Sequence, residues 1–167
     1  TISALMAIKK LYELGEIKRV LILVPRILVN QWFFEIIRSG FGVPRRIERD
    51  TIDSLVRENF PEGIYLASMD LVKIDRYFGK VREVDWDMII IDEAHRLGAK
   101  KKEATQRYRQ IGQKLIQSFP DRHVLLLSAT PHRGDPYDYI SRLRLVDPYL
   151  YPPGRLDNMD FYTKTTN

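Results

Sequence analysis

The sequence lacks cysteine, has few histidines and has no long apolar run, and each absence excludes a class of protein. Without cysteine, the 167 residues contain no disulfide framework, no thiolate zinc site and no cysteine nucleophile. The three histidines stand far apart, so a multi-histidine metal site is not expected. No apolar stretch approaches the roughly 20 residues of a membrane-spanning helix, and Lys9 and Lys10 interrupt the only segment placed like a signal peptide. We therefore expect an intracellular, soluble protein with no membrane partner, which would be cytoplasmic in a prokaryote.

The remaining composition is that of one globular domain with a mild positive charge. Hydrophobic residues make up 44% of the chain and charged residues 29%, which is enough to bury a core. Lysine and arginine number 27 against 22 acidic residues, so the formal net charge is +5. This balance favours an anionic partner such as nucleic acid, although many basic domains bind none.

Short apolar runs alternate with amphipathic segments along the chain. The apolar runs predict strands buried on both faces over 20–24, 64–67, 88–91 and 124–127, with a short exposed strand over 45–49. Helical spacing of apolar residues predicts helices over 1–14, 28–39, 52–60, 71–78, 105–119 and 137–145. This alternation predicts an α/β fold with a mostly parallel sheet covered on both sides. Ligands of such sheets bind at the carboxyl ends of the strands, so the chemistry is expected there.

Two adjacent carboxylates, Asp92 and Glu93, directly follow the strand over 88–91. Burying carboxylates at a strand end is costly unless they have partners. A nucleoside triphosphate site would supply them, because Asp92 can hold Mg²⁺ through its water shell and Glu93 can polarise the attacking water. The alternative is a strand end that turns polar at the surface, and two carboxylates alone do not separate these interpretations.

Two hydroxyl residues, Ser128 and Thr130, follow the strand over 124–127. Their side chains can hydrogen-bond groups on an adjacent loop, although serine and threonine are also common in turns for other reasons. Their position one helix and one strand after Asp92-Glu93-Ala94-His95 is the stronger signal.

The motifs at the strand ends resemble those of superfamily 2 helicases and translocases. Asp92-Glu93-Ala94-His95 resembles motif II, and Ser128-Ala129-Thr130 resembles motif III. Three further segments resemble the Swi/Snf-like branch, including its bacterial and archaeal RNA-polymerase-recycling type. Motif Ia of that branch is resembled by Val24-Pro25 with Asn30-Gln31-Trp32, and motif Ib by Ala67-Ser68-Met69-Asp70. The third segment runs from Leu143 to Pro148.

The resemblance implies a RecA-like three-layer domain over residues 1–150, followed by an extended tail over 151–167. It implies a parent protein that hydrolyses ATP with Mg²⁺ and moves along double-stranded DNA. Asp92 would hold the metal, Glu93 would act on the water, and His95 would link the nucleotide site to motif III.

Further site residues follow from the same resemblance. Ser128 and Thr130 would couple hydrolysis to movement. Arg26, Ser68 and Lys73 would lie along the nucleic-acid backbone, since phosphate contacts use positive charge and hydroxyls. Ordinary polar loops are the alternative for these three residues. The aromatic residues, Trp32 among them, lie in helical stripes and are interpreted as core or partner-domain contacts.

The sequence departs from the family pattern at its start. It has no glycine-rich loop ending in Gly-Lys-Ser or Gly-Lys-Thr, since Gly79-Lys80 leads to Val81. Thr1 resembles the end of that loop and would then be the second Mg²⁺ ligand. We expect Gly-Lys before Thr1 in the parent protein, after a strand whose absence leaves two neighbouring strands unpaired along one edge.

The resemblance also leaves partners and rival functions open. A second RecA-like domain is expected in the parent protein, and a transcription or DNA-repair complex is a candidate partner. The rival functions are another superfamily 2 motor, such as an RNA helicase or a restriction or phage-defence motor. A third possibility is a non-enzymatic binding module formed by this chain alone.

Overall fold

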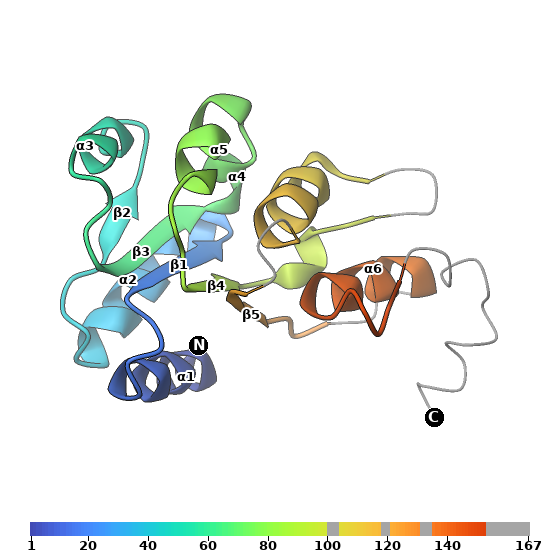
Figure 1. Ribbon diagram of the computed structural model, residues 1–167, viewed down its shortest axis with the longest axis horizontal. Coiled ribbons are helices and arrows are strands. Elements are labelled where there is room, and N and C mark those ends of the chain that lie inside the picture. Colours follow the sequence, from blue (N-terminus) through green and yellow to red (C-terminus); the bar gives the residue numbers. More distant parts are fainter. Residues whose placement is uncertain (100–103, 118–120, 131–134, 153–167) are drawn as a thin grey trace.

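The computed structural model describes residues 1–99, 104–117, 121–130 and 135–152, which form a five-stranded sheet with helices on both faces (Figure 1). The strands are β1 (Arg19–Val24), β2 (Arg45–Ile47), β3 (Gly63–Ser68), β4 (Met88–Ile91) and β5 (His123–Leu126). The longer helices are α1 (Ile2–Glu13), α2 (Val29–Arg38), α3 (Ile52–Arg57), α4 (Met69–Val72), α5 (Asp75–Arg82), η3 (Tyr108–Ile116) and α6 (Pro136–Val146), with short 3₁₀ turns η1 (Arg26–Leu28) and η2 (Ala94–Arg96). The predicted α/β class is confirmed.

All strand pairs are parallel, in the order β2-β3-β1-β4-β5. The register sets Leu23 beside both Ala67 and Ile91, and Ile91 beside Leu126. The carboxyl ends of β3, β1, β4 and β5 therefore lie level with one another. Residues that follow these strands meet at one edge of the sheet, as the sequence predicted.

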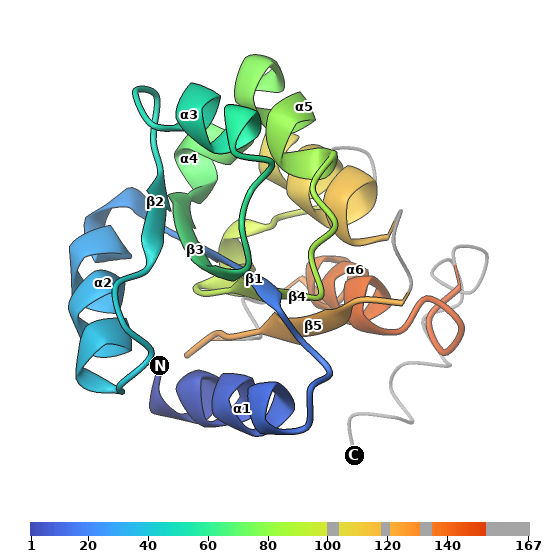
Figure 2. The ribbon, with the colours of Figure 1, turned by 60° about the vertical axis from the view of Figure 1, so that its left-hand side comes forward.

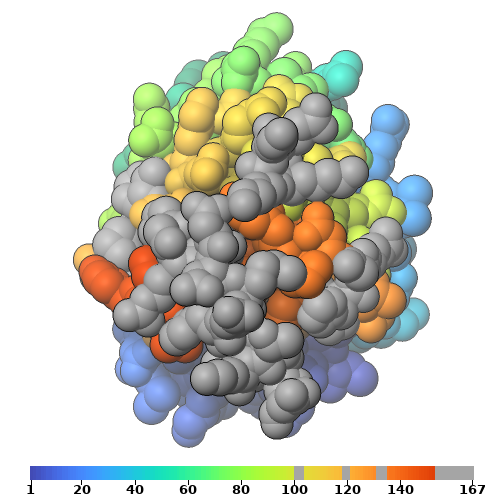
Figure 3. Space-filling view, turned by 90° about the vertical axis from the view of Figure 1, so that its right-hand side faces the viewer, coloured from blue at the N-terminus to red at the C-terminus, as the bar shows by residue number. Residues whose placement is uncertain are grey.

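Alternating side chains of each strand face two separate cores. Leu21, Leu23 and Ile89 pack in one cluster, while Val20 and Ile22 pack in the other. Figure 2 shows α1 and α2 on the face of the sheet that carries Val20 and Ile22, and α3, α4 and α5 on the face that carries Leu21 and Leu23. The helices η3 and α6 pack against each other on the α3–α5 side, and parts of both are visible on the face in Figure 3. This gives the three layers of helix, sheet and helix.

Three predicted helices differ in the structure. The helix predicted over 52–60 ends at Arg57, because Asn59 and Phe60 have left-handed backbone angles (φ 55° and 42°) that an α-helix does not allow. The helix predicted over 71–78 is wrong, because Ile74 is extended (φ −79°, ψ 125°) and separates α4 from α5. The helix predicted over 105–119 is a π-helix over Tyr108–Ile116, and Phe119 lies outside the described residues. In η3, a Cβ at Gly112 would lie 3.0 Å from Cδ1 of Leu145 in α6, so the glycine permits a close approach that helical periodicity does not predict.

The expectation of two neighbouring unpaired strands is wrong, because the sheet is continuous. Strand β4 pairs with β1 on one side and with β5 on the other, so β5 and β2 are the edge strands. The residues of β5 are exposed or half-buried, whereas all four residues of β4 are buried. The strand predicted over 45–49 is the edge strand β2, with Ile47 buried.

The chain after α6 is described only as far as residue 152, so the domain boundary near residue 150 and the tail over 151–167 stay predictions. In the described part of the chain, no helix has the length and apolar character needed to cross a membrane.

Candidate nucleotide and nucleic-acid site

The carboxylates of motif II lie at the carboxyl end of β4, where backbone bonds join three strands. The Asp92 N–H donates to the carbonyl of Leu23 at the end of β1 (2.9 Å), and the Ala94 N–H donates to the carbonyl of Leu127 beyond β5 (2.8 Å). Between them, Glu93 has left-handed backbone angles (φ 51°, ψ 45°). Such angles are uncommon for residues other than glycine and concentrate at functional sites. The turn places both carboxylates half-buried at the sheet edge.

A chain of side-chain contacts connects Glu93 to motif III through His95. The Nδ1 atom of His95 lies 3.0 Å from Oε2 of Glu93 and 3.2 Å from Oγ of Ser128. Only 9% of the His95 side chain is exposed, so this nitrogen is shielded from bulk water. The structure therefore brings together three residues that the resemblance implied. Glu93 follows β4, Ser128 follows β5, and His95 lies in η2.

The carboxylate of Asp92 is held by donors on both of its oxygens. Its Oδ1 accepts a hydrogen bond from the Glu93 N–H (2.8 Å), and its Oδ2 accepts one from the indole N–H of Trp32 (2.7 Å). Trp32 lies on α2 and is buried in the core, as the sequence predicted. Its contact with Asp92 was missed. The available signal was its place on the helix that follows β1, the strand beside β4.

These residues fit a Mg²⁺–nucleotide site in their donor chemistry. Asp92 supplies hard carboxylate oxygens that are half-buried and therefore reachable by a hydrated ion. No group of three or more His, Asp or Glu side chains suited to direct metal binding occurs in the described ranges. A hydrated Mg²⁺ ion held by one or two carboxylates and by substrate phosphates needs no such cluster.

Thr1 and Thr130 are less closely tied to this network. Thr1 precedes α1, is exposed, and accepts a hydrogen bond from the Leu5 N–H on its carbonyl (3.0 Å). Its side chain makes no capping hydrogen bond. Thr130 is exposed, and its backbone N–H donates to Oγ of Ser128 (3.3 Å). The metal role of Thr1 and the coupling role of Thr130 stay predictions.

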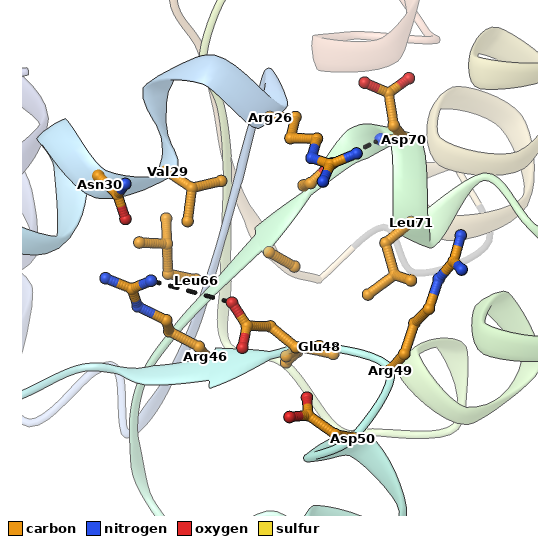
Figure 4. A pocket seen from close by; sticks show the side chains of 13 residues that line it. Arg26, Val29, Asn30, Arg46, Glu48, Arg49, Asp50, Leu66, Asp70 and Leu71 are labelled. Carbon is orange, nitrogen blue, oxygen red and sulfur yellow. Dashed lines mark hydrogen bonds and ion pairs between the residues drawn. The ribbon is translucent and has the colours of Figure 1, made fainter.

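An open pocket of about 520 Å³ lies at the carboxyl ends of β1, β2 and β3 (Figure 4). Figure 4 shows Arg26, Arg46 and Arg49 around it, with Asn30 contributed by α2. Its lining also includes Ser68, and the complete set is Arg26, Val29, Asn30, Arg46, Ile47, Glu48, Arg49, Asp50, Leu66, Ala67, Ser68, Asp70 and Leu71.

The charges of this pocket are balanced overall but not locally. Arg46 lies 3.9 Å from Glu48 and stacks on the ring of Phe33 at 4.1 Å. Among the described residues, no ion pair engages Arg26 or Arg49. Both of these side chains are exposed, so their guanidinium groups are available to an anion in the pocket.

Of the three residues implied for nucleic-acid contact, Arg26 and Ser68 line the pocket and Lys73 does not. The hydroxyl of Ser68 caps α4 by accepting from the Asp70 N–H (3.0 Å), and its own proton can still be donated. Lys73 is paired with Asp70 (3.0 Å), which also binds Arg107 (2.5 Å). The hydrogen bond from Arg107 is the main cause that lowers the pKa of Asp70 below its usual value. Asp70 therefore remains ionised at neutral pH and keeps its two cationic partners.

Comparison with known proteins matches the chain to one family and to much longer relatives. Residues 1–133 match the family described as Type III restriction enzyme, res subunit. The RNA polymerase-associated protein RapA of Proteus mirabilis is 35% identical over 154 residues, and that of Photobacterium profundum is 34% identical. The matches cover 89% of this chain but only 16% and 15% of the two relatives, so the chain spans about a sixth of their length.

Two solved structures share the fold. The Hef helicase domain of Pyrococcus furiosus superimposes with a TM-score of 0.63 at 20% identity, covering 87% of this chain and 30% of that one. The SWI2/SNF2 ATPase core of Sulfolobus solfataricus in complex with double-stranded DNA gives 0.58 at 17% identity, covering 85% and 28%. The chain belongs to the Type III restriction enzyme, res subunit family, and it shares the α/β fold of these two ATPase and helicase structures.

Proposed function

We propose that the protein containing this chain hydrolyses ATP with Mg²⁺ and uses the reaction to move along double-stranded DNA. The observation that supports this most is the chain of contacts from Glu93 through His95 to Ser128. It connects a carboxylate suited to polarising water with a hydroxyl on the neighbouring strand end. A purely structural strand end would need neither the left-handed turn at Glu93 nor a shielded histidine between two polar groups.

Each residue has a distinct part in this proposal. The carboxylate of Glu93 orients the attacking water and is itself held by Nδ1 of His95. Asp92 presents fixed oxygens to the water shell of Mg²⁺, which supplies charge neutralisation for the phosphates when bound. Ser128 contacts the same His95 nitrogen, so a shift of motif III changes the surroundings of Glu93. The chemistry is therefore positional and electrostatic.

The pocket at the ends of β1 to β3 is the proposed contact with the DNA backbone. Arg26 and Arg49 offer guanidinium groups, and Asn30 and Ser68 offer neutral donors. This mixture suits phosphate oxygens, which carry no sequence information. The Sulfolobus relative in fold was solved with double-stranded DNA, which supports duplex DNA as the substrate.

Arg26 gives the sharpest test of this contact. In the full-length protein, Arg26→Ala should weaken DNA binding and reduce the slope of log affinity against log salt by about one unit, as the loss of one phosphate contact does. Arg38→Ala is the matched control, because Arg38 is an exposed arginine at the other end of α2 and already pairs with Glu35 (3.6 Å). Equal salt slopes for the two variants would contradict the assignment.

A wild-type protein whose ATPase activity DNA does not stimulate would contradict the function itself.

The comparisons support two different partners for the protein, and experiment can distinguish them. The relatives named RNA polymerase-associated protein support RNA polymerase as the partner of this protein. The family description instead supports a motor of a restriction system. Co-purification with RNA polymerase from the native organism would support the first. DNA-dependent ATPase activity coupled to cleavage of unmodified DNA would support the second.

A further inference from the structure

The two tryptophans of the chain are equally buried but donate to different kinds of acceptor. Each side chain has a relative exposure of 1%. The indole N–H of Trp32 donates to Oδ2 of Asp92 (2.7 Å), 60 residues away in sequence. The indole N–H of Trp86 donates to the backbone carbonyl of Val81 (2.8 Å). An indole nitrogen is only a donor, so the direction of both bonds is fixed.

The bond from Trp32 completes the restraint on the Asp92 carboxylate. The Glu93 N–H already holds Oδ1, and this contact alone leaves the carboxylate free to change its tilt. The Trp32 indole holds Oδ2 from a different element of the fold, and the ring is itself fixed by core packing. An ionised carboxylate accepts about four hydrogen bonds, so both oxygens keep capacity for the water shell of a metal.

Helix α2 connects this carboxylate to the pocket at the strand ends. Its first turn contributes Val29 and Asn30 to the pocket lining, and Arg26 precedes it in η1. Trp32 lies on the inner face of the same turn, where it meets Asp92. One rigid element therefore borders the pocket on one side and supplies a donor to the motif II carboxylate on the other.

We propose that Trp32 is a positioning residue for Mg²⁺–nucleotide binding, acting through its indole hydrogen bond to Asp92. This rests on the proposed function, because it takes Asp92 as the residue that faces the metal. Trp32 touches neither substrate nor metal, and it sets the orientation of the carboxylate that faces the water shell of the metal. Partners of this kind commonly change metal affinity by about 10- to 100-fold when removed.

The first experiment compares Trp32→Phe with Trp86→Phe in the full-length protein. Both variants keep an aromatic ring in the core and lose one indole hydrogen bond. Binding of a fluorescent ATP analogue is measured in Mg²⁺ and in EDTA, and the ratio of the two affinities gives the metal-dependent part. We expect Trp32→Phe to reduce this ratio about tenfold or more, with Trp86→Phe unchanged. The ATPase KM and the Mg²⁺ concentration for half-activity should rise in the same variant.

A double-mutant cycle tests whether Trp32 acts through Asp92. In an Asp92→Asn background, the carboxylate is gone and Trp32→Phe should have no further effect on the metal-dependent ratio. Additive losses would overturn the proposal, because they would show an effect that bypasses Asp92. Should Trp32→Phe fail to fold, 3-benzothienylalanine at position 32 keeps the ring size and removes only the N–H. This replacement is then expected to show the same loss.

The outcomes separate this inference from the proposed function. A wild-type protein with no Mg²⁺-dependent nucleotide binding would overturn the function and this inference with it. A wild-type protein that binds Mg²⁺–nucleotide, with Trp32→Phe no different from Trp86→Phe, would overturn the inference alone.

Discussion

At the scale of single residues, the charge of Glu93 is the feature on which the proposed hydrolysis depends most. Glu93→Gln keeps the shape of the side chain and removes the charge that polarises water. We expect nucleotide binding to be kept, while turnover falls by about 10²–10⁴-fold, the usual contribution of a general base. Single-turnover hydrolysis and equilibrium binding, measured on the same preparation, check this prediction.

The neighbouring carboxylate provides the control for that experiment. Asp92→Asn should weaken Mg²⁺-dependent nucleotide binding instead, because the amide is a poorer partner for the hydrated cation. Similar kinetics for Glu93→Gln and the wild type would show that the contact between Glu93 and His95 is structural.

Ser128 is the hydroxyl of motif III that the structure places on His95. Ser128→Ala removes the contact to Nδ1 of His95 and the bond from the Thr130 N–H. A lost hydrogen bond costs about 1 kcal/mol, so the fold should survive. We expect basal ATPase activity to be largely kept and DNA-driven movement to be lost. A triplex-displacement assay beside an ATPase assay measures both.

Ser141→Ala is the matched control for Ser128→Ala. The Ser141 hydroxyl is buried in α6 and donates to the Tyr137 carbonyl (2.7 Å), so this variant loses a hydrogen bond of the same kind elsewhere. Normal translocation by Ser128→Ala would show that the contact between Ser128 and His95 is only structural.

At the scale of elements, the contact between η3 and α6 depends on a glycine. A Cβ at position 112 would lie 3.0 Å and 3.1 Å from the two Cδ atoms of Leu145. We expect Gly112→Ala to lower the free energy of unfolding by about 1–3 kcal/mol, because the packed side chain must shift. Chemical denaturation of the protein, followed by circular dichroism, measures this change.

Gly79 in α5 provides the comparison. A Cβ at that position meets no atom within 4 Å, and the residue is helical. Gly79→Ala should therefore leave stability unchanged or raise it by up to about 1 kcal/mol. Equal effects of the two alanines would show that the approach of η3 to α6 is not tight.

At the scale of the whole molecule, the 167-residue chain by itself should bind nucleotide poorly. It contains no Gly-Lys-Ser or Gly-Lys-Thr loop for the phosphates. In addition, β5 is an edge strand whose residues are exposed or half-buried. We expect no measurable ATPase activity and very weak Mg–ATP binding. DNA binding should be salt-sensitive and independent of sequence, because it rests on the net charge of +5.

Calorimetry with Mg–ATP and DNA titrations at two salt concentrations measure these properties of the isolated chain. A chain extended toward its parent protein serves as the control and should regain nucleotide binding. Micromolar affinity in the isolated chain would reveal a nucleotide site elsewhere in these residues.

The sequence by itself determined the strands and the residues that follow them. Continuous apolar runs are distinctive, so β1, β3, β4 and β5 were predicted to within one residue at every end. Because parallel strands align their carboxyl ends, placing the segment after β4 close to the segment after β5 needed no side-chain detail. The motif resemblance then supplied roles that spacing alone leaves open.

Only the tertiary structure decided which side chains meet at that edge. The bond from Trp32 to Asp92 spans 60 residues, and the contact between His95 and Ser128 spans 33. Periodicity reports which face of an element is buried, and it correctly placed Trp32 inside. It carries no information on where an indole N–H points or which lone pair receives it. Those directions depend on strand register and on the left-handed turn at Glu93, which arise only when the elements pack together.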